Sequence, residues 1–148
     1  MKNKEKYAKE IMEIACNGSS IAVTKKCRRI APCGSTFCEE CLFCSANCKE
    51  KVREWSESEY IEVISKRDRA FLEYLDTIIH YVTRDLNDDL HIYISKPHKL
   101  IDCWESSGCE LDKSLKFFKL DFPMVKWEDD KPWLIEDLKK LEVVEEYE

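Results

Sequence analysis

The chain has 148 residues, of which 44% are hydrophobic, 36% charged and 11% aromatic. This composition excludes an intrinsically disordered chain, and the apolar runs are too short to span a membrane. The net charge of −6 is unevenly distributed: residues 1–51 carry ten Lys/Arg and six Asp/Glu, whereas residues 52–148 carry fourteen Lys/Arg and twenty-four Asp/Glu. We therefore expect a weakly basic module followed by a larger acidic domain.

The first segment, residues 3–16, has the periodicity of an amphipathic helix. Apolar side chains recur at steps of three and four residues from Tyr7 to Ile14, and Gly18 is a typical residue at a helix end. A short strand is expected at residues 21–24.

A basic cluster follows this strand. Its members are Lys25, Lys26, Arg28 and Arg29. Such a cluster can contact phosphates, but no aromatic residues are interleaved with it to stack on bases. We favour a solvated loop whose positive charge offsets nearby thiolates, and we keep nucleic-acid binding as the alternative.

The most informative stretch is CRRIAPCGSTFCEECLFCSANC, residues 27–48. It holds six of the nine cysteines and contains two overlapping C-x-x-C spacings. Two intervening residues let both thiolates bind one ion. Disulfides are disfavoured because the N-terminus has no secretory signal and the cysteine count is odd. The stretch therefore predicts a zinc site, with an iron–sulfur cluster or unliganded thiols as alternatives.

Four of these cysteines are expected to bind the zinc: Cys33, Cys38, Cys41 and Cys48. Cys38 and Cys41 are the best C-x-x-C pair, and Gly34 permits a tight backbone next to Cys33. Four sulfur ligands leave no coordination position for water, so the site would be structural and not catalytic.

The choice of ligands leaves alternatives among the other cysteines. Cys44 is the main alternative ligand, although between Phe43 and Ser45 it could also be a small buried residue. Cys27 and Cys16 are the next candidates. A second helix is expected at residues 46–60, and its first turn would carry Cys48.

The second domain is expected to begin with a helix that Ser65 caps, with Asp68 as its capping partner. Residues 78–83 and 90–95 then alternate in the manner of a β-hairpin around an Asn-Asp-Asp turn.

The rest of this domain is predicted to add short elements. Further strands are expected at residues 100–104 and 115–118, with a short extended piece at 124–127. A final helix would start at Asp129 or Asp130.

The fold class is therefore α+β. It consists of a helical zinc-binding module at residues 1–62, followed at residues 63–148 by an acidic domain in which helices pack on a small antiparallel sheet. The module is too small to bury enough apolar area alone, so zinc would supply much of its folding energy.

No catalytic constellation can be named in the sequence. His80 and His91 fall in the predicted hairpin, and the chain has neither a nucleophile elbow nor a glycine-rich phosphate loop. A second metal site formed by His98, Cys103 and Cys109 is a weaker interpretation than partly buried thiols. We therefore expect no enzymatic activity and no small-molecule substrate.

Four segments carry a resemblance to a known family: the cysteine-rich stretch running into VREWSESEY, then ISKRDRAFLEYL, TRDLNDDLHIYISKP and DFPMVKWEDDKPWLIEDLKKLEVV. Together they resemble a family of small proteins from prophages of Gram-positive bacteria, over most of residues 30–148. The cysteines that match its pattern are Cys38, Cys41 and Cys48. The chain is similar, more loosely, to zinc-containing anti-CRISPR proteins, which inhibit the RNA-guided nuclease of type II systems.

The resemblance implies a non-enzymatic cytoplasmic protein of the host bacterial cell that binds the CRISPR effector nuclease. Such an inhibitor would occupy a surface needed for loading guide RNA or target DNA. The acidic half could dock on the basic channel of the nuclease, or it could consist of solvated helix faces. The alternative functions are a zinc-dependent nucleic-acid-binding or regulatory phage protein, and a self-associating virion component.

Overall fold

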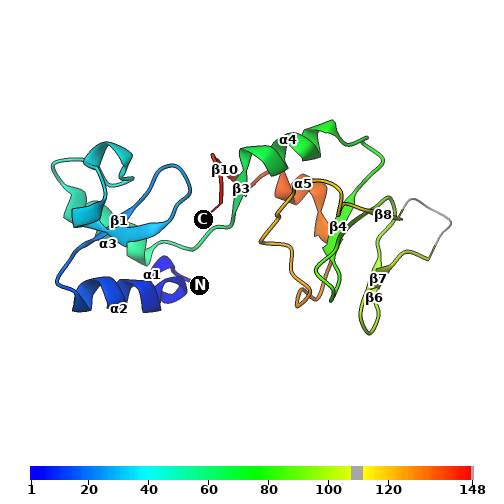
Figure 1. Cartoon of the computed structure of the whole chain (residues 1–148), viewed down its shortest axis with the longest axis horizontal. Helices are drawn as coiled ribbons and strands as arrows, with labels where there is room; N and C mark the ends of the chain where they lie inside the picture. Colours follow the sequence, from blue (N-terminus) through cyan, green and yellow to red (C-terminus); the bar gives the residue numbers. More distant parts are fainter. Residues whose placement is uncertain (108–111, 148) are drawn as a thin grey trace. The chain divides into compact units, whose positions relative to one another are not determined.

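The computed structural model describes residues 1–107 and 112–147, so Cys109 lies outside the described residues. The chain divides into two compact units (Figure 1), which we call unit 1 and unit 2. Unit 1 contains Met1–Ile61 and the C-terminal residues from Val144 onward; unit 2 contains Glu62–Val143. Both combine helices with small antiparallel sheets, which confirms the α+β class. Within the described residues, no helix has the length and apolarity needed to cross a membrane.

The helices of unit 1 lie where the sequence predicts them, with one interruption. The first helical segment is split into α1 (Asn3–Lys6) and α2 (Ala8–Cys16), because Tyr7 leaves the helical conformation with φ −107° and ψ 23°. α3 (Cys48–Glu57) begins two residues later than expected. The buried amide of Asn3 donates hydrogen bonds to the Trp55 carbonyl at 2.9 Å and to Ser58 Oγ at 3.0 Å, which ties α1 to the end of α3.

The sheet of unit 1 is a two-stranded hairpin. β1 (Ile21–Val23) pairs antiparallel with β2 (Ile30–Pro32), with Ala22 opposite Ala31. Two single turns of 3-10 helix follow, at Cys33–Ser35 (η1) and Cys38–Glu40 (η2).

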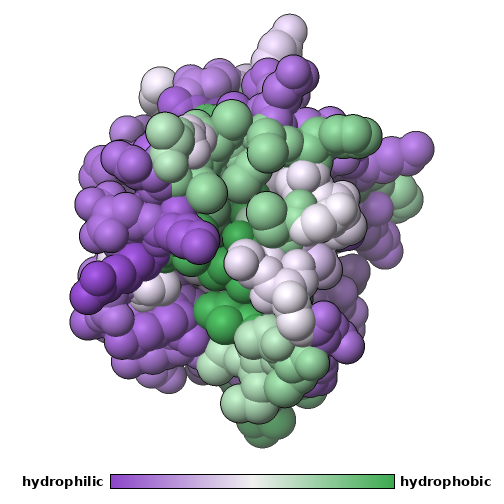
Figure 2. All heavy atoms as spheres, turned by 90° about the vertical axis from the view of Figure 1, so that its left-hand side faces the viewer, coloured by the Kyte–Doolittle hydropathy of each residue, from purple (hydrophilic) through white to green (hydrophobic). Residues whose placement is uncertain are grey.

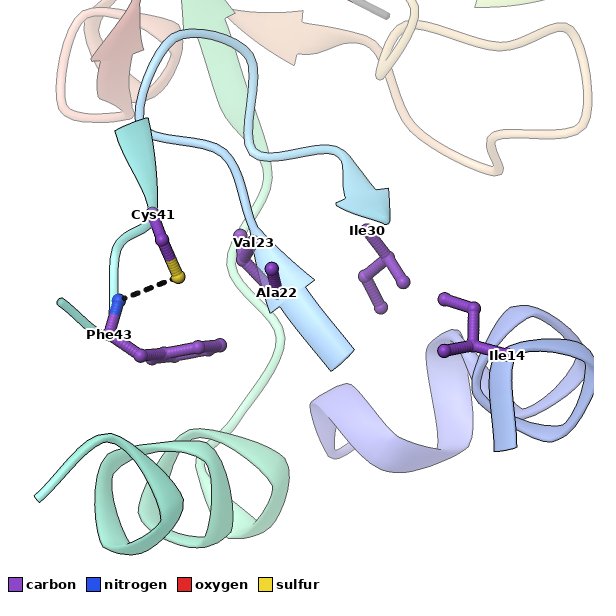
Figure 3. Packing of buried hydrophobic residues seen from close by; sticks show 6 residues of the cluster. All are labelled: Ile14, Ala22, Val23, Ile30, Cys41 and Phe43. Atoms are coloured by element: carbon purple, nitrogen blue, oxygen red, sulfur yellow. Dashed lines mark hydrogen bonds between the residues drawn. The ribbon is translucent and has the colours of Figure 1, made fainter. Parts of the chain in front are cut away.

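The core of unit 1 is small (Figure 3). Its buried members are Ile14, Ala22, Val23, Ile30, Cys41 and Phe43. Phe43 meets the ring of Trp55 edge-on at 5.7 Å between centroids, which attaches α3 to this core.

Unit 2 is built on a four-stranded antiparallel sheet with the strand order β8-β5-β4-β9. The predicted hairpin is confirmed as β4 (Tyr81–Arg84) and β5 (Leu90–Tyr93). The edge strands are β8 (Asp112–Ser114) and β9 (Trp133–Leu134). Residues of this unit that are fully buried include Ile64, Leu72, Val82, Tyr93, Phe122 and Leu138.

The expected helix start at Ser65 is also confirmed. β3 (Val63–Ser65) leads directly into α4 (Lys66–Tyr74), and Ser65 Oγ accepts a hydrogen bond from the Asp68 backbone N–H at 3.2 Å. The Asp68 side chain does not return to Ser65. It accepts instead from the backbone N–H groups of Asp121 and Phe122.

Two of the predicted strands are wrong. Residues 100–103 form the turn between β6 (His98–Lys99) and β7 (Trp104–Glu105), closed by a hydrogen bond of 2.7 Å from the Leu100 N–H to the Cys103 carbonyl. Residues 115–118 form a turn after β8 and not a strand. In both places the ladder hydrogen bonds form on neighbouring residues.

The predicted C-terminal helix is mostly wrong. Only α5 (Ile135–Leu138) is helical, and β10 (Glu142–Val144) follows it and pairs with β3. The Asp129 carboxylate does not cap a helix, because it accepts hydrogen bonds from the Lys126 backbone N–H and from Trp133 Nε1. The extended piece expected at residues 124–127 is also wrong, since the described backbone there has no strand.

Candidate metal centre

The two C-x-x-C spacings lie on consecutive tight turns of unit 1. Cys38 starts η2, and the Cys41 N–H donates to the Cys38 carbonyl at 3.1 Å. The Cys44 N–H donates in turn to the Cys41 carbonyl at 3.2 Å. Cys38 and Cys44 are exposed, whereas Cys41 is buried. These turns place three sulfur-bearing residues on one short segment.

Cys41 sits in the small core with one hydrogen bond to its sulfur. Its Sγ accepts from the Phe43 N–H at 3.4 Å (Figure 3), and its exposed fraction is only 9%. An N–H directed at a sulfur suits the thiolate form, which is the form that binds metals. Cys41 therefore has one feature of a zinc ligand, as expected for a C-x-x-C turn.

The C-x-x-C turns also contact the loop between β1 and β2. The sequence did not reveal this contact. Cys41 forms an isolated antiparallel bridge with Thr24. The Thr24 hydroxyl lies 3.3 Å from Cys27 Sγ. Cys27 is therefore close in space to the C-x-x-C turns although it is eleven residues from Cys38 in the chain.

The remaining two predicted ligands lie elsewhere in the unit. Cys33 starts η1 at the open end of the hairpin, where its N–H donates to the Ser20 carbonyl at 2.7 Å. Cys48 is the first residue of α3. Both are exposed. The structure thus brings Cys38 and Cys41 together and leaves Cys33 apart from them.

The residue types are those that bind zinc, but their side chains do not converge on one point in this structure. Within residues 1–107 and 112–147, no three His, Cys, Asp or Glu side chains are close enough together to hold a metal ion. Thiolates on C-x-x-C turns are nevertheless the ligands of structural zinc sites. The fit therefore lies in the backbone, and binding would require the exposed thiols to turn toward a common point.

The basic cluster occupies the loop between β1 and β2. Lys25 Nζ donates to the Glu39 carbonyl at 2.8 Å, and Lys26 Nζ forms an ion pair with Glu146 at 2.5 Å. The hydrogen bond to Glu146 and its charge raise the pKa of Lys26. At least two of the four cations therefore already have partners in the chain.

Unit 2 has a polar cluster around the buried carboxylate of Asp85. Asp85 is buried, accepts from the Trp104 backbone N–H at 2.9 Å and lies 3.4 Å from His91 Nε2. Nearby, burial and then the Asp102 carboxylate raise the pKa of the Cys103 thiol. A thiol in that state is a poor nucleophile and a poor metal ligand. These contacts serve to join strands and turns.

Comparisons with protein-family models, with curated proteins and with solved structures find no match for this chain.

Proposed function

We propose that the chain is a non-enzymatic protein whose unit 1 is stabilised by one structural zinc ion. The main support for this proposal is that unit 1 has few buried core residues and many cysteines. Its core has six buried residues, while the same unit contains seven cysteines, of which five are exposed. Small domains with few buried side chains are commonly stabilised by a metal or by disulfides.

The proposed activity is the binding of a protein partner. Unit 1 exposes large apolar side chains, with Phe37 at 77% and Met12 at 66% exposure. Figure 2 shows apolar side chains gathered in a band that hydrophilic side chains flank. Exposed apolar patches with polar rims are typical of interaction surfaces. The partner that the resemblance implies is the type II CRISPR effector nuclease, which the bound protein would inhibit.

The charges favour a protein partner over nucleic acid. Lys25 and Lys26 are engaged within unit 1, and residues 62–143 carry eighteen Asp/Glu against thirteen Lys/Arg. A net negative surface is repelled by a phosphate backbone and attracted by a basic nucleic-acid channel. Direct nucleic-acid binding through the basic loop is therefore the less favoured function.

The test uses the full chain, purified without chelator. We expect about one zinc per chain, co-elution with the guide-loaded nuclease, and loss of target-DNA cleavage when the protein is added in excess. Absence of co-elution and unchanged cleavage would reject the inhibitor. A salt-sensitive shift of bare duplex DNA that is lost in Arg29→Glu would instead support the nucleic-acid-binding function.

A further inference from the structure

We infer that Cys27, and not Cys33, is a ligand of the zinc ion, together with Cys38, Cys41 and Cys44. The inference rests on the structural zinc proposed above and names the residues that bind it. In this ligand set, Cys27 and Cys44 replace Cys33 and Cys48 of the set expected from spacing.

Thr24 and Cys41 face each other on two antiparallel backbone segments. The Leu42 N–H donates to the Val23 carbonyl at 2.7 Å, and the Lys25 N–H donates to the Glu40 carbonyl at 2.8 Å. These two bonds flank Thr24 and Cys41, which are therefore a non-hydrogen-bonded antiparallel pair. In such a pair the Cα atoms are about 4.5 Å apart and the side chains lie on the same face.

Cys27 lies next to this face. Since Thr24 Oγ1 is 3.3 Å from Cys27 Sγ, the sulfurs of Cys27 and Cys41 both lie next to the Thr24 side chain. They are also the two least exposed cysteines of the stretch, Cys41 being buried and Cys27 half-buried. Cys27 and Cys41 therefore flank the same Thr24 side chain, and we take them as the fixed half of the binding site.

Cys44 ends the second of the two C-x-x-C turns. In a C-x-x-C turn that binds metal, backbone N–H groups after the first cysteine point at its sulfur. The Phe43 N–H points at Cys41 Sγ in this way, whereas the Glu40 N–H after Cys38 donates to the Phe37 carbonyl at 3.0 Å. The metal-binding turn therefore runs from Cys41 to Cys44.

The fourth ligand, Cys38, lies on a turn that is joined to the loop of Cys27. The Lys25 side chain donates to the Glu39 carbonyl at 2.8 Å, which holds η2 against that loop. Cys38 and Cys44 are both exposed, so their side chains are free to change rotamer and converge on an ion beside Cys27 and Cys41.

Distance excludes Cys33 from the same ion. Cys33 is bonded to Ser20, which precedes Thr24 by four residues along β1. At about 3.3 Å per residue, this separates Cys33 from the level of Cys41 by roughly 13 Å. Two sulfurs on one zinc are at most about 4.6 Å apart, twice the Zn–S bond length. Two cysteine side chains cannot close that gap without breaking the hairpin.

The test compares serine substitutions in the full-length protein by zinc titration and by the absorption spectrum of the cobalt-substituted protein. We expect Cys27→Ser to lower zinc affinity more than about 100-fold, beyond the 10–100-fold effect of losing an outer-shell partner. Cys33→Ser and the matched surface control Cys16→Ser should bind like the parent. Parent-like binding by Cys27→Ser, or loss of binding in Cys33→Ser, would overturn the assignment.

A histidine pair keeps the test decisive if Cys27→Ser fails to fold, because imidazole also binds zinc. We expect Cys27→His to bind one cobalt ion with the spectrum of three thiolates and one nitrogen, and Cys33→His to keep the four-thiolate spectrum. The reverse pattern contradicts the inference. A parent protein that binds neither zinc nor cobalt would instead reject the structural zinc, so the two failures are distinguishable.

Discussion

The buried carboxylate of Asp68 shows how one residue positions a distant segment. Asp68 is fully buried on α4, where its oxygens accept from the Phe122 N–H at 2.7 Å and from the Asp121 N–H at 3.4 Å. Phe122 has a positive φ of 36°, which an L-residue adopts only under constraint. Asp68 supplies part of that constraint.

Arg84 binds backbone carbonyl groups of the same segment, residues 121–125. Its guanidinium donates to the Asp121 carbonyl at 2.5 Å, the Phe122 carbonyl at 3.2 Å and the Val125 carbonyl at 2.8 Å. A carboxylate on one side and a guanidinium on the other therefore hold residues 121–125. The turn at Phe122 and Pro123 is therefore held by side chains of α4 and β4.

Replacing Asp68 by Ala should destabilise unit 2. The change leaves two backbone N–H groups without their acceptor, which costs about 2–4 kcal/mol of unfolding free energy. Urea unfolding followed by tryptophan fluorescence reports this unit, because it contains Trp104, Trp127 and Trp133 of the four tryptophans. The control Glu73→Ala removes only a surface ion pair on the same helix and should cost less than about 0.5 kcal/mol. Equal effects of the two changes would contradict this account.

Sequence reasoning works at the residue scale when the signal is local. The cap at Ser65 was predictable, because an N-cap and its N–H partner are three residues apart. The proximity of Cys27 to Cys41 was not predictable. Both lie next to Thr24, and the pairing of Thr24 with Cys41 spans seventeen residues of the chain. For that reason, spacing alone identifies a set of candidate thiols but not the ligands.

At the scale of elements, the contact between α1 and α3 depends on charge. The Glu57 carboxylate pairs with Lys2 at 2.7 Å and with Lys4 at 2.5 Å. The hydrogen bonds from Lys2 and then from Lys4 hold the pKa of Glu57 at about 2, below its usual 4.5. Lys2, the residue before α1, and Lys4 within α1 thus share a single carboxylate at the end of α3.

This contact predicts a loss of stability in acid. Because the folded-state pKa of Glu57 is lowered, its contribution is complete above pH 4.5 and is lost as the pH falls toward 2. An NMR titration of the side-chain carboxyl carbon should give a midpoint near 2 at low salt. The midpoint should move toward 4.5 at high salt, because exposed ion pairs are screened.

The matched variant Glu57→Gln removes the titrating group and keeps its shape. Thermal unfolding of this variant should depend less on pH between 4.5 and 2 than that of the parent. If both proteins have the same pH profile, the ion pairs with Lys2 and Lys4 do not persist in solution.

The elements that the sequence predicts correctly are those whose hydrogen bonds stay local. The β4–β5 hairpin follows from alternation around an Asn-Asp-Asp turn, and α2 follows from helical periodicity. The predicted helix after Asp129 fails because side chains compete with it: Asp129 accepts from Trp133 Nε1, and the Asp129 carbonyl accepts from Lys99 Nζ at 3.1 Å. Local side-chain hydrogen bonds of this kind offer the backbone an alternative to a helix.

At the scale of the molecule, the two units differ in what stabilises them. Unit 2 has a four-stranded sheet and fully buried side chains such as Tyr93, Phe122 and Leu138. Unit 1 has a two-stranded hairpin and a core cluster with six buried residues, against which further side chains pack partly buried. We therefore expect the proposed zinc to stabilise unit 1 and not unit 2, because unit 1 has the smaller core.

Removal of the metal should therefore unfold unit 1 and leave unit 2 folded. On addition of a strong zinc chelator to the full chain, we expect the amide NMR signals of residues 1–61 and 144–147 to collapse to unfolded positions, because ligand binding supplies folding energy there. The signals of β4 and β5 should keep their dispersion, because Val82 and Ile92 remain buried without metal. Added zinc should restore the spectrum. Signals that stay unchanged throughout, or that collapse in both units together, would show that the metal does not stabilise unit 1 in this way.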